Sequence, residues 1–288
     1  MIGAPIFVIA RLTIREASRR RLLLAVVILT LVLIGATTWG FAILTSLPCR
    51  NGEPCSPIES KILAATLLIL VAFMFSFILT LGAVFITAPA VVSEVESGVA
   101  LAMLARPIRR SDVVIGKWLG LATILAGYTL VTTSIEFAAV SVFVGYTPPH
   151  PIMASTFLFA ESLVMLTLAL LCSTRLPPMT GGVVALILFG LAWIGGIARA
   201  VGEALGADTV RTIGQVTTLI LPTDGLWRGA LFSLEPSLLL QGAGSGRGFA
   251  ANPFFAIGPP PPEYLAWAAA WVVAILGLAV FSFNRRQL

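Results

Sequence analysis

Charged residues are scarce in this sequence. Only 11% of its 288 residues are charged and 58% are hydrophobic, with a mean hydropathy of +1.01, whereas soluble domains carry about 25% charged residues. A water-soluble core of this length could not bury so much apolar surface, but lipid can surround it. The composition therefore excludes a soluble two-domain protein and indicates a chain embedded in a membrane.

Histidine and cysteine are also rare, at one and three residues, and no C-x-x-C or similar ligand spacing occurs. A basic stripe interleaved with stacking aromatics is missing as well, which excludes nucleic acid as a partner. Cys49 and Cys55 share one short polar loop. Outside the cytoplasm these thiols can form a small disulfide ring. The alternative is a metal site with His150 and Met153 nearby; we expect the disulfide and no metal.

Six long apolar runs are what the sequence does contain. Each reaches the ~20 residues that a hydrocarbon core of ~30 Å requires. The predicted fold is therefore an all-α integral membrane protein with six transmembrane helices in one domain, residues 1–288. The predicted spans are residues 22–44, 62–88, 118–146, 152–174, 179–198 and 264–283.

The segment at residues 199–263, between the last two spans, is too long for a turn and too apolar for a disordered linker. Residues 209–221 and 225–234 are predicted to be short helices leaning on the membrane. The segment either meets an extracytoplasmic partner or acts only as a packed lid.

The basic residues are distributed unevenly along the chain. An even number of spans places both termini on one side of the membrane. Most of the 18 Lys and Arg residues lie on that side, before the first span, in residues 93–117 and after the last span. Cytoplasmic loops carry such an excess. We therefore expect a multi-pass plasma-membrane protein with both termini and residues 93–117 in the cytoplasm.

Residues 5–21 are predicted to form a helix that lies on the membrane surface. Arg11, Arg15 and Arg19 share one face, opposite Ile6 and Ile9. The basic face suits anionic lipid headgroups, although simple basic flanking of the first span is an alternative.

A pair of glycines, Gly116 and Gly120, stands at the foot of the third span. This spacing allows a second helix to approach closely. The alternative is coincidence in a chain with 26 glycines.

Residues 93–117 form a charged island between two apolar runs. Ser93 and Glu96 have the spacing of a capping box, so the sequence predicts a helix of about three turns over Glu94–Ala105, which Pro107 would end. Ser111 is then placed to cap the third span. An ordinary charged loop is the alternative.

Glu136 and Glu161 are the two charges placed deep within predicted spans. Each lies ten residues from the turn that joins its span to the other, at Tyr146 and Pro151 respectively. At 1.5 Å per residue, both carboxylates are about 15 Å below that turn. Intramembrane carboxylates are functional suspects, so both residues are candidates for a translocation path. The alternative is a structural interhelical hydrogen bond. Because no Lys or Arg lies at that depth, these carboxyl groups are either protonated or hydrogen-bonded to Thr132, Thr133 or Thr167.

Several motifs resemble those of type-2 ABC exporter permeases. The cytoplasmic loop of that family has a Glu, a Ser/Thr-Gly step, a Leu-rich turn, Pro-x-x-Arg and Gly-Lys. The matching residues here are Glu96, Ser97, Gly98, Leu101, Leu104, Arg106, Pro107, Ile108, Arg109, Arg110, Gly116 and Lys117. Residues Ala10–Leu24 resemble the start of the nitrous-oxide-reductase maturation transporter permease, and Leu221–Leu231 resembles a Leu-Pro segment of relatives.

The resemblance implies a transmembrane subunit that exports a substrate and works with a separate ABC ATPase subunit. ATP and magnesium would be bound by that partner, and a second permease copy or paralogue would complete a dimer. The sequence agrees, since the one Gly-Lys pair is followed by Trp118 and no phosphate-loop motif occurs. A scaffold that docks a partner without transport, and an intramembrane enzyme using Glu136 and Glu161, are the alternatives.

By the same resemblance, the island carries the coupling helix that docks on the ATPase. The implied docking residues are Glu94, Glu96, Ser97, Gly98, Leu101, Leu104, Arg106, Pro107, Arg109 and Arg110.

Overall fold

A computed structural model describes residues 4–18, 21–44, 57–92, 109–235, 254–256 and 258–285. Throughout these ranges the chain is helical or in turns, without strands. The helices are α1 (Ala4–Ala17), α2 (Arg21–Leu44), α3 (Pro57–Thr87), α6 (Arg110–Val144), α7 (Pro151–Ser173), α8 (Pro178–Leu205), α9 (Asp208–Ile220), α10 (Thr223–Leu234) and α13 (Pro262–Asn284).

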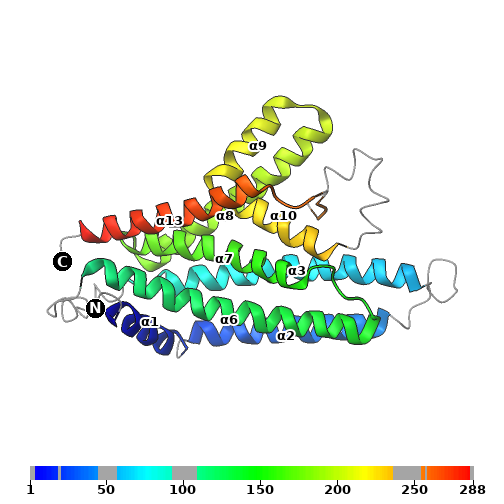
Figure 1. Cartoon of the computed structure of the whole chain (residues 1–288), viewed down its shortest axis with the longest axis horizontal. Coiled ribbons are helices and arrows are strands. Elements are labelled where there is room, and N and C mark those ends of the chain that lie inside the picture. The colour runs from blue at the N-terminus through cyan, green and yellow to red at the C-terminus, as the bar shows by residue number, and fades with distance from the viewer. Residues whose placement is uncertain are drawn as a thin grey trace.

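Six of these helices, α2, α3, α6, α7, α8 and α13, are long and apolar enough to cross a membrane. This confirms the all-α fold with six candidate spans. Figure 1 shows that α1 and the last turn of α13 lie at the same end of the bundle, so both described chain ends are on one side.

The third span begins earlier than predicted. Helix α6 starts at Arg110, about two turns before Trp118, and its N-cap is Arg109, which makes no capping hydrogen bond through its side chain. Ser111 therefore lies inside the helix, and the prediction that it caps this span is wrong. The hydroxyl of Ser111 faces the Asp112 carboxylate at 3.4 Å instead.

Helix α7 forms the centre of the bundle. It packs against α3, α6, α8, α10 and α13, and in Figure 1 it runs through the middle of the molecule. Its span is 61% buried, against 6% for α2. Helix α2 instead exposes large apolar side chains such as Leu24, Ile28 and Val32, as expected for a helix facing lipid.

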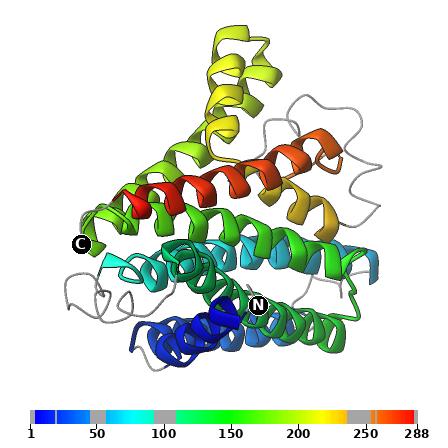
Figure 2. The ribbon, with the colours of Figure 1, turned by 60° about the vertical axis from the view of Figure 1, so that its left-hand side comes forward.

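Helix α1 packs along the first turns of α6 through the two glycines. A Cβ on Gly116 would lie 2.8 Å from the Cβ of Ile9, and one on Gly120 would lie 2.6 Å from the carbonyl oxygen of Ala10. The prediction that this pair admits a close helix is confirmed. The views in Figures 1 and 2 agree in placing α1 beside α6.

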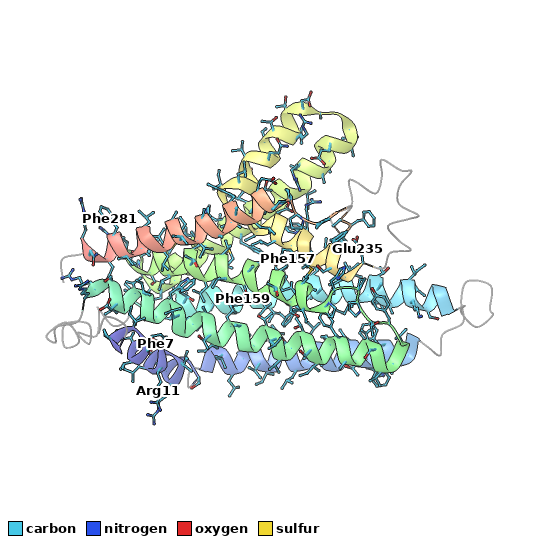
Figure 3. All side chains as sticks on the ribbon, in the orientation of Figure 1. Phe7, Arg11, Phe157, Phe159, Glu235 and Phe281 are labelled. Atoms are coloured by element: carbon cyan, nitrogen blue, oxygen red, sulfur yellow. The ribbon has the colours of Figure 1, made fainter. Side chains whose placement is uncertain are left out.

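The outward face of α1 carries both bases and apolar groups. Arg11 and Arg15 are exposed, and so are Phe7 and Leu12. Figure 3 shows Arg11 pointing away from the bundle. This mixture suits a helix at the boundary between headgroups and acyl chains.

The segment after the fifth span folds as a helical hairpin followed by a buried helix. Helix α8 continues to Leu205, past the predicted end at residue 198, and turns back into α9 at Gly206, whose φ is +67°. Helices α9 and α10 agree with the two predicted short helices to within two residues. Figure 1 shows the α8–α9 hairpin rising away from the bundle, whereas α10 lies against it.

Candidate functional site

The island predicted to dock a partner lies mostly outside the described residues, which stop at Val92 and resume at Arg109. This applies to the predicted docking residues Glu94, Glu96, Ser97, Gly98, Leu101, Leu104, Arg106 and Pro107. The structure does describe both attachment points of the island, at the end of α3 and the start of α6.

Two basic residues anchor the start of α6. Lys117, expected in the cytoplasmic island, is buried, and its ammonium group donates a hydrogen bond to the carbonyl of Ala90 in the turn after α3. The guanidinium of Arg110 donates to the carbonyl oxygens of Phe283 and Asn284, at 3.5 and 3.3 Å. Cations at a helix C-terminus stabilise its free carbonyls. The ends of α3, α6 and α13 are thus joined beside the island, while Arg109 is exposed.

Glu136 and Glu161 are both buried inside the bundle, each against a different neighbouring helix. The Thr37 hydroxyl of α2 donates to the two carboxyl oxygens of Glu136, at 2.9 and 3.1 Å. The Ser76 hydroxyl of α3 donates to Glu161 at 2.8 Å. Each carboxyl group therefore joins two spans by a hydrogen bond, as polar side chains commonly do in membrane bundles. The translocation role of these residues stays a prediction.

The predicted partners of these carboxyl groups were wrong. Thr132 donates to the carbonyl of Tyr128, while Thr133 shares a hydrogen bond of 2.8 Å with Ser155. Thr167 accepts one of 2.9 Å from the Trp118 indole. Threonine hydroxyls in helices often donate to a carbonyl of the preceding turn of their own helix. The hydroxyls expected to reach the two carboxyl groups are therefore already engaged.

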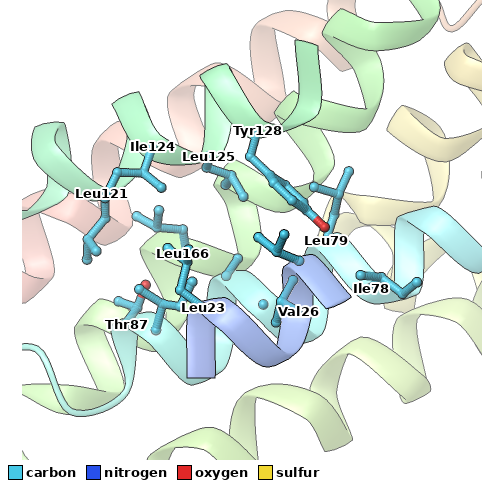
Figure 4. Close-up of a pocket in the computed structure, with 14 residues that line it drawn as sticks. Leu23, Val26, Ile78, Leu79, Thr87, Leu121, Ile124, Leu125, Tyr128 and Leu166 are labelled. Atoms are coloured by element: carbon cyan, nitrogen blue, oxygen red, sulfur yellow. The ribbon is translucent and has the colours of Figure 1, made fainter. Parts of the chain in front are cut away.

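An apolar cavity of about 200 Å³ lies between α2, α3, α6 and α7. Figure 4 shows Leu23 and Val26 of α2 facing Leu121 and Leu125 of α6 across it. Its lining is almost wholly hydrocarbon, so it suits an apolar group. No resemblance or spacing in the sequence indicated this cavity.

A second cavity, of about 280 Å³, has both charged and apolar walls and lies where α8, α10 and the start of α13 meet; we refer to it as the polar cavity. Asp224 of α10 is buried there and forms ion pairs with Arg199 of α8 and Arg228 of α10. We refer to these three side chains as the Arg–Asp–Arg cluster. Sequence reasoning missed it, because Arg199 is 25 positions from Asp224 and only the folded chain brings them together.

Glu235 is another buried carboxyl group, at the end of α10 (Figure 3). One of its oxygens accepts a hydrogen bond of 2.9 Å from the Ala256 amide. Burial raises the pKa of Glu235 to about 7, against a smaller lowering by that hydrogen bond.

The remaining candidate is the cysteine pair. Cys49 and Cys55 lie at residues 45–56, outside the described part of the chain. Among the described residues, no group of three or more His, Cys, Asp or Glu side chains is placed to hold a metal ion.

The chain matches a known protein family over residues 7–288. The matching family model is described as ABC-2 family transporter protein. No curated protein matches the chain. The family match covers all six candidate spans and the island together.

Proposed function

Because this chain belongs to the ABC-2 family of transporter proteins, we propose that it is the permease subunit of an exporter driven by a separate ABC ATPase. The observation that carries this proposal is the family match from residue 7 to residue 288, nearly the whole length of a six-span bundle. Permeases of this family typically work with an ABC ATPase. The substrate crosses through this subunit, while ATP and magnesium are bound by the partner.

The proposed docking element is the coupling helix, Glu94–Ala105, flanked by Arg106, Pro107, Arg109 and Arg110. Force applied to this loop must reach the spans for transport to be coupled to ATP hydrolysis. The hydrogen bonds of Lys117 to Ala90 and of Arg110 to the end of α13 support this route, because they join the ends of three spans next to the loop. A displacement of the loop would then move α3, α6 and α13 together.

The proposed assembly contains two permease subunits, two ATPases and cytoplasmic chain ends. The shared position of the chain ends in Figure 1 supports an even number of crossings, and the excess of Lys and Arg on that side supports a cytoplasmic orientation. Two copies related by a two-fold axis would enclose a substrate path between them.

Co-purification followed by reconstitution tests this function. The tagged full-length chain is purified in mild detergent, the copurifying ATPase is identified by its activity, and the complex is placed in liposomes. We expect Glu96→Lys in the loop to reduce both ATPase recovery and turnover. Glu263→Lys makes the same charge change at an exposed site at the start of α13, and it should alter neither.

The two alternatives predict other outcomes. A scaffold would recover a partner without any coupled ATP turnover. An intramembrane enzyme would keep its activity when the ATPase is absent and would lose it in Glu136→Gln or Glu161→Gln. Either result would contradict the transporter proposal.

A further inference from the structure

The Arg–Asp–Arg cluster carries more positive charge than its single buried acid neutralises. Arg199 places Nη2 at 3.4 Å and Arg228 places Nε at 3.0 Å from the same Asp224 oxygen. Two guanidinium groups on one carboxylate leave one net positive charge on the cluster itself. Glu203 lines the same cavity but is exposed to solvent, which screens its charge.

Arg199 also has donor capacity to spare. A guanidinium carries five N–H donors. The Nε of Arg199 is buried and has no hydrogen-bond partner among the residues that the structure describes. A buried donor without a partner is unfavourable. The Arg199 side chain as a whole is 29% exposed and lines the cavity, so an anion there would meet N–H groups other than Nε.

The cluster is held in place by close backbone contacts. A Cβ on Gly196 would lie 1.9 Å from a carboxyl oxygen of Asp224, so α8 presses directly on the acid. Arg228 also donates to the carbonyl of Gly196 at 3.2 Å. The Tyr264 hydroxyl accepts a hydrogen bond of 3.1 Å from the amide of Gly225. Asp224 and Arg228 are therefore held in place before any ligand arrives, which lowers the entropy lost on binding.

From this geometry we propose that the cavity binds a phosphoryl oxyanion, either free or on a lipid headgroup. Guanidinium groups match the oxygens of phosphate through paired, charge-assisted hydrogen bonds. A divalent cation is disfavoured, because both arginines would repel it. This site goes beyond the transport proposal and exists whether or not the chain moves a substrate.

A neighbouring apolar groove provides room for the acyl chains of a lipid. The groove, of about 540 Å³, is lined by residues of α7, α10 and α13. It includes Leu226 and Leu265, which directly follow Gly225 and Tyr264 of the polar cavity. A phospholipid could thus place its phosphate at the arginines and its chains along the groove.

Direct binding measurements on the full-length chain in micelles of a non-ionic detergent without phosphate test this proposal. The probes are inorganic phosphate, short-chain phosphatidylglycerol and short-chain phosphatidylcholine, each titrated by calorimetry. In Arg199→Gln, Asp224 keeps Arg228 as its partner, so the cluster survives while one guanidinium is lost. We expect binding on the order of tenfold weaker, as for a lost hydrogen bond to a charged group.

The matched control is Arg211→Gln. Arg211 is a half-exposed arginine of α9 that pairs with exposed Asp208 at 3.2 Å, outside the cavity. This variant removes the same charge from the chain and should bind the probes as tightly as the original protein.

The outcomes separate the sources of the phosphoryl group. Binding of both inorganic phosphate and phosphatidylglycerol supports a site for the oxyanion itself, and binding of phosphatidylglycerol alone supports a lipid site. Binding of neither probe, equal affinity in Arg199→Gln and the original chain, or equal loss in Arg211→Gln would overturn the proposal.

A second substitution tests it in the opposite direction. Asp224→Asn removes the acid that competes with the ligand for both arginines, so a folded variant should bind phosphate several-fold more tightly, by about the effect of removing one nearby like charge. Thermal unfolding establishes that the variant is folded. Unchanged or weaker phosphate binding by folded Asp224→Asn would contradict the proposed site.

Discussion

Replacing Gly120 with alanine should loosen helix α1 from α6. The new Cβ would lie 2.6 Å from the carbonyl oxygen of Ala10 and 2.9 Å from the Cβ of Thr13, both closer than real Cβ contacts. The first of these neighbours is backbone and cannot rotate away, so the whole of α1 has to move outward.

The expected magnitude follows from two opposing effects. Overpacking of this kind costs about 1–3 kcal/mol, whereas exchanging glycine for alanine within a helix gains up to about 1 kcal/mol. The net cost to α1 docking is therefore on the order of 1–2 kcal/mol, or roughly tenfold in the population of the undocked helix.

Amide hydrogen exchange on the full-length protein measures this population. Exchange at residues 4–17 should accelerate roughly tenfold in Gly120→Ala, because the amides of α1 exchange more readily when the helix is undocked. The matched control is Gly127→Ala on the same helix, where a Cβ has open space around it, and exchange in α1 should be unchanged. Equal exchange rates of α1 in the two variants would refute the close contact between α1 and Gly120.

Three further predictions concern the buried polar groups. Gly196→Ala should lower the free energy of unfolding by about 1–3 kcal/mol, because the new Cβ displaces the acid of the Arg–Asp–Arg cluster. The control is Gly190→Ala on the same helix, where a Cβ meets nothing within 4 Å and stability should not change. The melting temperatures of the two variants test this difference. The raised pKa of Glu235 means that the folded state binds its proton more tightly than the unfolded state, so stability should fall as pH rises from 4.5 through about 7, by up to about 3 kcal/mol. In Glu235→Gln the melting temperature should change less with pH over this range. If the variant and the original protein show the same pH dependence, Glu235 is not the group responsible. Glu136→Gln and Glu161→Gln keep an oxygen acceptor for their hydroxyl partners, so both should fold; if ATP-driven transport is also unchanged in both, neither carboxyl group serves a translocation path.

The sequence predicted features that depend on local pattern. The six spans follow from apolar length, since a helix must cross a fixed thickness of hydrocarbon. Helices α9 and α10 were expected as short helices because their segment is too long for a turn and too apolar for a disordered linker. The spacing of Gly116 and Gly120 indicated a close helix, because these residues share a face whatever the partner is. The partner itself, α1, was not foreseen.

The tertiary structure decided which groups meet across helices. Hydrogen bonds to nearby threonines were one of two expectations for Glu136 and Glu161, yet their partners come from α2 and α3. Lys117 was expected in water, yet it is buried against the turn after α3. The direction in which a helix faces its neighbours is not contained in its own sequence pattern once nearly every residue is apolar, because the hydrophobic contrast that orients soluble helices is absent.

The polar cavity is the clearest case of a site that the sequence pattern did not predict. Arg199 and Asp224 belong to different helices, and the hairpin of α8 and α9 has to fold back before they meet. Composition and spacing alone established a six-span membrane protein with a charged island. Only the packed helices placed two arginines on one buried acid, because that contact depends on helix orientation across the bundle and not on local sequence pattern.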